Sequence, residues 1–213
     1  MRYSRPVPAS DRELLDLWAR GDRRAGNQLF QRHFDALFRF FRAKVPDGAD
    51  DLIQRTFLAL VERAPGLPPT AEVRPYLFGI ARNVLYRRFR DERRDGRVFD
   101  PLETSVADLG TSPSAIADRR EQLRLLHAAL LAIPVEHQIL LELYFWEELP
   151  AAEIAVALEV PEGTVRSRLR KAKELLGAAL STRAPSPGLV DETLDDLAGW
   201  ARQLRAALDR DAG

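Results

Sequence analysis

Apolar side chains recur three and four residues apart along almost the whole chain, and this spacing places them on one face of a helix. No segment alternates apolar with polar residues as a half-buried strand does, and no repeat has the length of a solenoid unit. The sequence therefore predicts an all-α fold. In its first half, a helix capped by Ser10 and Asp11 is followed by helices over about 23–44, 49–63 and 75–94.

One stretch near the middle interrupts this pattern. Residues 98–114 are rich in Pro, Gly, Ser and Thr and have too little periodic apolar surface to form a core. We therefore expect two helical domains joined by a flexible acidic linker, followed by a C-terminal extension with one helix over about 191–210. The expected boundaries are 1–96, 97–118, 119–181 and 182–213.

Composition argues against several classes of protein. None of the 213 residues is Cys, and His33, His127 and His137 lack the spacing of metal ligands, so neither disulfides nor a zinc site is expected. The sequence has no phosphate-binding loop and no nucleophile elbow, which argues against an enzyme and against a bound cofactor. No apolar run approaches a bilayer span, and residues 1–10 lack the apolar stretch of a signal peptide. We expect a cytoplasmic protein.

The distribution of charge is more informative than its sum. The chain has 32 basic and 32 acidic residues. However, residues 74–97 hold eight arginines against three acids, and residues 161–173 hold five basic residues against one acid. The segment between them, 98–118, has four acids and no basic residue. Two such basic islands can contact a polyanion at two places, although solvated helix faces give the same pattern.

Residues 149–176 have the pattern of a helix-turn-helix, with a turn at 159–161. Four apolar residues of the second helix fall within one sector and predict its core face: Val165, Leu169, Ala172 and Leu176. The opposite side carries Arg166, Ser167, Arg170 and Lys171. A helix with a buried apolar stripe and an exposed basic stripe can enter a DNA major groove, where Arg binds guanine and Lys binds phosphate. The alternative is an ordinary amphipathic helix pair in a bundle.

Several short motifs follow one another along the chain: Gly21-Asp22 with 29–33, then 49–57, 74–77 with 80–83, Ile133-Pro134, Tyr144, 153–155 and 163–169. In this order they resemble the extracytoplasmic-function group of the sigma-70 family, which keeps only sigma regions 2 and 4. The last motif is the most specific, and the resemblance covers about 11–180. It implies an alternative sigma factor without catalytic activity, which binds the clamp helices of the largest subunit of bacterial RNA polymerase and directs transcription initiation at promoter DNA.

The resemblance assigns polymerase binding to the helix over 49–63. Asp51 and Gln54 would make polar contacts there, and Leu52 and Phe57 would add packing. Arg55 stands where the family usually has an acid, which would alter the affinity for the core enzyme. Plain helix-surface polarity also accounts for Asp51 and Gln54. The resemblance leaves open whether an anti-sigma factor is a further partner.

The resemblance also implies that the helix over 75–94 recognises and melts the −10 element. Asn83 and the loop 65–73 would form a pocket for a base flipped out of the non-template strand, while Arg87 and Arg88 hold phosphates. Tyr76 would stack on a base, although it is equally compatible with a core aromatic. The −35 element would be read as duplex by Arg166, Ser167, Arg170 and Lys171.

Four positions of the second domain depart from the family pattern. Glu148 replaces a common glycine, Gln138 replaces a common arginine, and Pro150 and Pro161 replace serine caps. Both prolines are expected at first helical positions, where a missing N–H matters little. The fold is expected to survive these changes with modest DNA affinity.

The extension after about residue 180 is not explained by the resemblance. Its helix carries an apolar stripe with Trp200 that is too long to be left in solvent. It can dock on either domain and regulate promoter or polymerase binding, or it can extend the core of the second domain.

Two other functions are compatible with the sequence. One is a stand-alone helix-turn-helix regulator that binds DNA without polymerase and uses its first half as a sensing domain. The other is a sigma-like protein that sequesters polymerase without initiating transcription.

Overall fold

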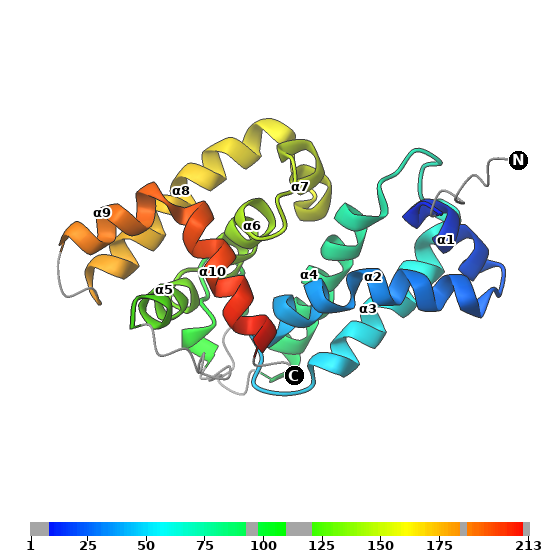
Figure 1. Cartoon of the computed structure of the whole chain (residues 1–213), viewed down its shortest axis with the longest axis horizontal. Coiled ribbons are helices and arrows are strands. Elements are labelled where there is room, and N and C mark those ends of the chain that lie inside the picture. Colours follow the sequence, from blue (N-terminus) through cyan, green and yellow to red (C-terminus); the bar gives the residue numbers. More distant parts are fainter. Residues whose placement is uncertain (1–8, 93–97, 110–120, 184–186, 211–213) are drawn as a thin grey trace, which may run out of the picture.

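The computed structural model describes residues 9–92, 98–109, 121–183 and 187–210, which form ten α-helices, two short 3-10 helices and no strand (Figure 1). The all-α expectation is confirmed. The first domain contains α1 (Asp11–Ala19), α2 (Arg23–Arg42), α3 (Ala49–Arg63), η1 (Ala64–Gly66) and α4 (Val73–Glu92). The second contains α5 (Glu121–Leu131), α6 (Val135–Phe145), α7 (Ala151–Leu158) and α8 (Glu162–Ser181), and η2 (Ala107–Leu109) precedes it. In the described part of the chain, no helix has the length and apolar character needed to span a membrane.

Local signals set where the first helices begin. Ser10 forms a capping box with Glu13 at the start of α1, and the carboxylate of Asp22 accepts two backbone N–H hydrogen bonds at the start of α2. Gly48, with a φ of 73°, supplies a left-handed conformation directly before α3. These signals fix where α1, α2 and α3 begin.

The expected helix-turn-helix is formed by α7 and α8. The chain leaves α7 through Glu159, which adopts a left-handed conformation with a φ of 56°. Pro150 and Pro161 occupy the N-cap positions of α7 and α8, one residue earlier than expected. Proline has no backbone N–H, and at an N-cap this group would have no partner within the helix, so both helices begin without loss of an internal hydrogen bond.

In place of the flexible linker expected over 97–118, residues 98–109 are packed on the second domain and on α4. Val106 is fully buried, and the Phe99 ring lies against the rings of Tyr86 and Phe89. The backbone N–H of Val135 donates to the carbonyl of Thr104 at 3.0 Å, which ties this segment to the start of α6. Phe99 and Val106 therefore anchor the segment to the two domains. The rest of the expected linker lies outside the described residues.

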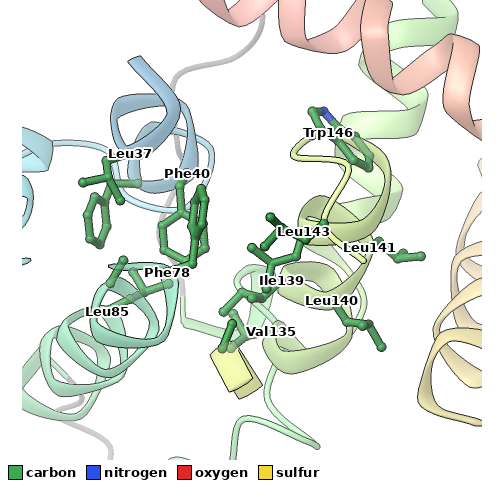
Figure 2. Close-up of a cluster of buried hydrophobic side chains, with 14 of the residues drawn as sticks. Leu37, Phe40, Phe78, Leu85, Val135, Ile139, Leu140, Leu141, Leu143 and Trp146 are labelled. Atoms are coloured by element: carbon green, nitrogen blue, oxygen red, sulfur yellow. The ribbon is translucent and has the colours of Figure 1, made fainter. Parts of the chain in front are cut away.

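The two domains share one continuous apolar core. Figure 2 shows Phe40 of α2 and Phe78 of α4 facing Ile139 and Leu143 of α6. The helices α4 and α7 also pack closely, because a Cβ atom added to Gly79 would lie only 3.0 Å from the carbonyl oxygen of Ala157. The relative placement of the domains, which the sequence left undetermined, is therefore set by direct contact.

The C-terminal extension forms two helices instead of the one expected over 191–210. These are α9 (Pro187–Asp195) and α10 (Leu197–Arg210), separated at Asp196. The carboxylate of Asp196 accepts a hydrogen bond from the backbone N–H of Gly199 at 2.9 Å, so it caps α10 and breaks the longer helix. α9 packs on α8, whereas α10 contacts α2, α5 and α6.

Candidate promoter and polymerase interface

The second helix of the helix-turn-helix, α8, exposes the basic face that the sequence predicts. Val165, Ala172 and Leu176 are buried, and Leu169 is half-buried at the edge of the core. The exposed side carries Arg166, Ser167, Arg170 and Lys171. The helix therefore presents the four predicted side chains together to solvent. Their contact with DNA stays a prediction.

Two features of α8 were not identified from the sequence. Glu174 lies 3.8 Å from Arg170 and 3.9 Å from Lys171, so it partly neutralises the basic face through weak, exposed ion pairs. Arg168, in contrast, is half-buried and donates to Glu136 of α6 at 3.2 Å. This bond orients α8 on the body of the domain and leaves Arg166 and Ser167 outward.

The predicted −10 residues lie on α4, but they are not equally accessible. Arg87 is exposed, whereas Tyr76, Asn83 and Arg88 are half-buried. Arg88 pairs with Asp47 at 3.1 Å and with Glu92 at 2.5 Å, so these carboxylates compete with any phosphate for its guanidinium group.

A groove adjoins α4 where the sequence predicts a pocket for a base. Tyr76 lines it together with Gly66 and Leu67 from the loop over 65–73, while Asn83 is not among its lining residues. Its opposite wall comes from Val156 and Glu159 of the helix-turn-helix. The helix-turn-helix therefore lies on the face of α4 that the resemblance assigns to the −10 element.

Asn83 belongs to a neighbouring polar cluster. Its side-chain oxygen accepts from Arg82 at 3.3 Å, and Arg82 also donates to Glu159 at 3.2 Å. Asn83 is therefore connected through Arg82 to the turn of the helix-turn-helix.

The predicted polymerase-binding helix, α3, presents only part of the expected set. Asp51 and Gln54 are exposed, whereas Leu52 and Phe57 are 1% and 3% exposed. The expectation that Leu52 and Phe57 contact a partner is wrong for this arrangement, because both side chains fill the core of their own domain. Arg55 lies 2.8 Å from Asp51, one helical turn away, and both are exposed. Leu58, which the sequence pattern did not single out, is 63% exposed within this polar surface.

Comparison with known proteins identifies both domains. Residues 29–95 match the family model described as Sigma-70 region 2, and residues 123–176 match the one described as Sigma-70, region 4. The chain is 32% identical over 176 residues to the ECF RNA polymerase sigma factor SigM of Mycobacterium tuberculosis, which covers 80% of this chain and 85% of that protein. It is also 32% identical over 158 residues to SigL of the same species, covering 71% of this chain and 86% of that protein. The chain is an extracytoplasmic-function sigma factor.

A solved structure shows the same fold. The structure of CnrH in complex with the cytosolic domain of CnrY matches 83% of this sigma factor and all of that chain, with a TM-score of 0.59 and 24% sequence identity. The domain of α1–α4 is therefore called region 2 below, and the domain of α5–α8 is called region 4.

Polar contacts cross the boundary between regions 2 and 4 of this sigma factor. The ammonium group of Lys44 is buried beside the carboxylate of Glu142, which also accepts from Gln138 at 2.9 Å. Burial lowers the pKa of Lys44 and raises the pKa of Glu142, while the attraction between the two charges opposes both shifts. A second link joins Arg74 of α4 to Glu147 at 2.5 Å.

Glu136 forms a further link between the two predicted DNA-binding helices. One of its carboxylate oxygens accepts from the hydroxyl of Tyr86 on α4, and the other accepts from Arg168 on α8. Burial raises the pKa of Tyr86, with a further contribution from the negative charge of Glu136, so the phenol stays protonated and donates. The sigma factor thus holds region 4 on region 2 through several charged groups as well as through apolar contacts.

Proposed function

We propose that this sigma factor binds RNA polymerase core through α3, reads the −35 promoter element with α8, and recognises and melts the −10 element with α4. The observation that carries the proposal is the exposed basic face of α8, which lies opposite a buried apolar stripe. This geometry is the one that a recognition helix needs to enter a major groove.

Each exposed side chain of α8 has a role suited to its chemistry. Arg166 and Arg170 carry planar guanidinium groups that can bind the O6 and N7 atoms of guanine in two parallel hydrogen bonds. Lys171 offers a point charge for phosphate, and Ser167, whose hydroxyl bonds to the carbonyl of Thr164 at 2.9 Å, allows a close approach of the helix.

The roles proposed for α4 require a change in the arrangement described above. Tyr76 shares its groove with Val156 and Glu159, and Asn83 is connected through Arg82 to Glu159. A flipped base would therefore reach both side chains only when α7 leaves the face of α4. Arg87 is already exposed and can contact the DNA backbone before that change. Arg88 would exchange its carboxylate partners for phosphate. Promoter melting therefore requires that regions 2 and 4 separate.

The exposed side of α3 is the proposed contact with polymerase core. Asp51 and Gln54 provide polar groups, and Leu58 provides an apolar contact between them and the end of the helix. Leu52 and Phe57 stabilise the helix from behind. The ion pair between Arg55 and Asp51 reduces the negative charge of this surface, so the proposed contact relies less on acidic groups than is usual in the family.

The sigma factor would also have a protein partner besides RNA polymerase. CnrH was solved in complex with the cytosolic domain of CnrY, and we propose that the present sigma factor also binds a protein partner, an anti-sigma factor that restrains it. It would act in the cytoplasm, where RNA polymerase and promoter DNA are found, and it would supply recognition while the polymerase supplies the chemistry.

Run-off transcription with bacterial core polymerase tests this proposal. The template is a genomic fragment from upstream of the gene, with and without the purified protein. We expect a protein-dependent transcript that Arg166→Ala weakens on the order of tenfold, because one arginine–guanine contact contributes about 1–3 kcal/mol. Arg124→Ala, which removes an exposed arginine from α5, is the matched control.

The other outcomes separate the rival functions. Binding to core polymerase without any transcript would favour sequestration. Tight binding to duplex DNA with no polymerase contact would favour a stand-alone regulator. A transcript that both arginine variants leave unchanged would overturn the role of α8.

A further inference from the structure

The helix α10 lies across the boundary between the two sigma regions. It contacts α2 of region 2 and both α5 and α6 of region 4. Figure 1 shows α10, in red, crossing the middle of the molecule between these elements. An extension that only enlarged the core of region 4 would have no contact with α2.

The contacts of α10 are suited to hold two surfaces together. Leu204 is buried and lines a small cavity at the boundary, facing Phe40 and Phe78 of region 2 and Leu143 of region 4. The guanidinium group of Arg205 donates to the backbone carbonyl of Trp146 at 3.2 Å. Because Leu204 lines a cavity between the two domains, the apolar surface that it buries there is exposed again when the domains separate.

The position of α10 is itself secured. In α9, Val190 and Thr193 are buried, and Leu194 packs against Gly177 of α8 so closely that an added Cβ would lie 3.0 Å from its side chain. Asp196 then caps α10. The helix α10 is thus anchored to region 4 by α9, and it also contacts α2 of region 2.

The boundary is held by apolar contacts between α2, α4, α6 and α7 and by ion pairs, and α10 adds further apolar surface to it. The buried charges of Lys44 and Glu142 must be desolvated before they can pair, which offsets much of their mutual attraction. The apolar contacts of Leu204 have no such penalty.

We propose that α10 is an intramolecular clasp, which holds region 4 against region 2 and keeps the −10 face of α4 covered until polymerase or DNA binds. The proposal rests on the proposed function in one respect, since the covered surface is the one assigned to −10 recognition. The role of α10 in holding the domains together does not depend on that assignment and can be tested without DNA.

The test measures the distance between the domains in the full chain. Because the sequence has no cysteine, Arg23→Cys on α2 and Ala178→Cys on α8 provide two unique, exposed sites for spin labels. We expect one narrow distance distribution in the parent protein. In Leu204→Asp, the fraction of longer distances should rise roughly tenfold or more, because loss of a buried leucine side chain has an effect of this size. Arg202→Ala, an exposed change on the same helix, should leave the distribution unchanged.

A second, less severe variant keeps the test decisive if Leu204→Asp does not fold. If circular dichroism shows that Leu204→Asp has lost helix, then Leu204→Ala decides, because it shortens the side chain without adding a charge. A distance distribution that matches the parent in the folded variant would overturn the clasp.

Transcription separates this proposal from the one before it. With core polymerase in limiting amount, Leu204→Ala should give severalfold more transcript than the parent at the same low sigma concentration. Domain opening in a protein that supports no transcription would retain the clasp and overturn the proposed function. Normal transcription with unchanged distances in Leu204→Ala would retain the proposed function and overturn the clasp.

Discussion

Lys44 of region 2 and Glu142 of region 4 are separated by 98 positions in the chain, yet they form a buried ion pair across the domain boundary. The ammonium group also donates to the carbonyl of Phe40 at 2.7 Å, and Gln138 donates to the other oxygen of Glu142. Both charged groups are thus paired and hydrogen-bonded inside the domain boundary.

Removing one partner of this pair should be strongly destabilising. Lys44→Met leaves the Glu142 carboxylate buried without its cation, and we expect the free energy of unfolding to fall by about 3–5 kcal/mol. The double change Lys44→Met with Glu142→Leu should recover most of that loss, because no charge is then buried. Urea denaturation of both single variants and the double variant measures the coupling. A loss below about 1 kcal/mol in Lys44→Met, as for an exposed pair, would contradict this account.

Acid should weaken the fold through His127. This side chain is buried beside Lys44, and burial lowers its pKa from 6.5 to about 4. The folded state therefore resists protonation of His127. The contribution of the neutral imidazole to the free energy of unfolding is complete above pH 6.5 and is lost as the pH falls toward 4. We expect His127 to account for roughly 2 kcal/mol of the stability lost between pH 7 and pH 5.

Denaturation curves of the parent and His127→Gln at both pH values measure this contribution. Glutamine can keep the hydrogen bond to the backbone of Ala43 but does not titrate. The parent should lose more stability than the variant on acidification. Equal losses in the two proteins would exclude His127 as the cause.

Replacing Glu148 with glycine, the common residue of the family pattern, should stabilise the protein. It adopts a left-handed backbone conformation with a φ of 53°, which is unfavourable for a residue with a Cβ atom by roughly 1–2 kcal/mol. The side chain is exposed. Glu148→Gly should therefore raise the free energy of unfolding by about 1 kcal/mol, and the Tm by about 2–4 °C.

Glu159→Gly is the matched comparison for this change. Glu159 has a similar φ of 56°, but it also pairs with Arg82, so its replacement loses a contact and should give a smaller gain. Scanning calorimetry of both variants ranks the two effects. A lower Tm for Glu148→Gly than for the parent would show that the left-handed backbone is not strained.

Gly79 should tolerate no side chain at the interface of α4 and α7. A methyl group there would lie 3.0 Å from the carbonyl oxygen of Ala157, which is backbone and cannot rotate away. Overpacking of this kind is unfavourable by about 1–3 kcal/mol, whereas alanine improves a helix over glycine by only about 1 kcal/mol. Gly79→Ala should therefore push the domains apart, which the spin-label distances described above would detect. Gly66→Ala, where no atom lies within 4 Å, should have no such effect.

The helices could be predicted because each is specified by neighbours within one or two turns. Ser10 and Asp22 mark helix starts, and the spacing of Val165, Leu169 and Ala172 fixes which side of α8 is buried. The direction in which Arg166 and Arg170 point follows from that periodicity alone.

The contacts between the domains could not be predicted in this way. Nothing in the sequence near Lys44 identifies Glu142 as its partner, and the charge of Glu136 gives no sign that Tyr86 will bind it. For the same reason the resemblance located α3 correctly as a helix, yet it assigned Leu52 and Phe57 to an external contact although they are core residues. Exposure depends on which elements pack together, and that information lies far apart in the chain.

The carboxylate of Glu136 allows the domain boundary to open without stranding a buried charge. When region 2 departs, Tyr86 returns to water as a neutral phenol, while Arg168 of the same domain stays within reach of Glu136. No ion is left unpaired in an apolar environment on this side of the boundary. At Glu136, separation of the two regions would therefore resemble the undocking of two finished surfaces more than partial unfolding.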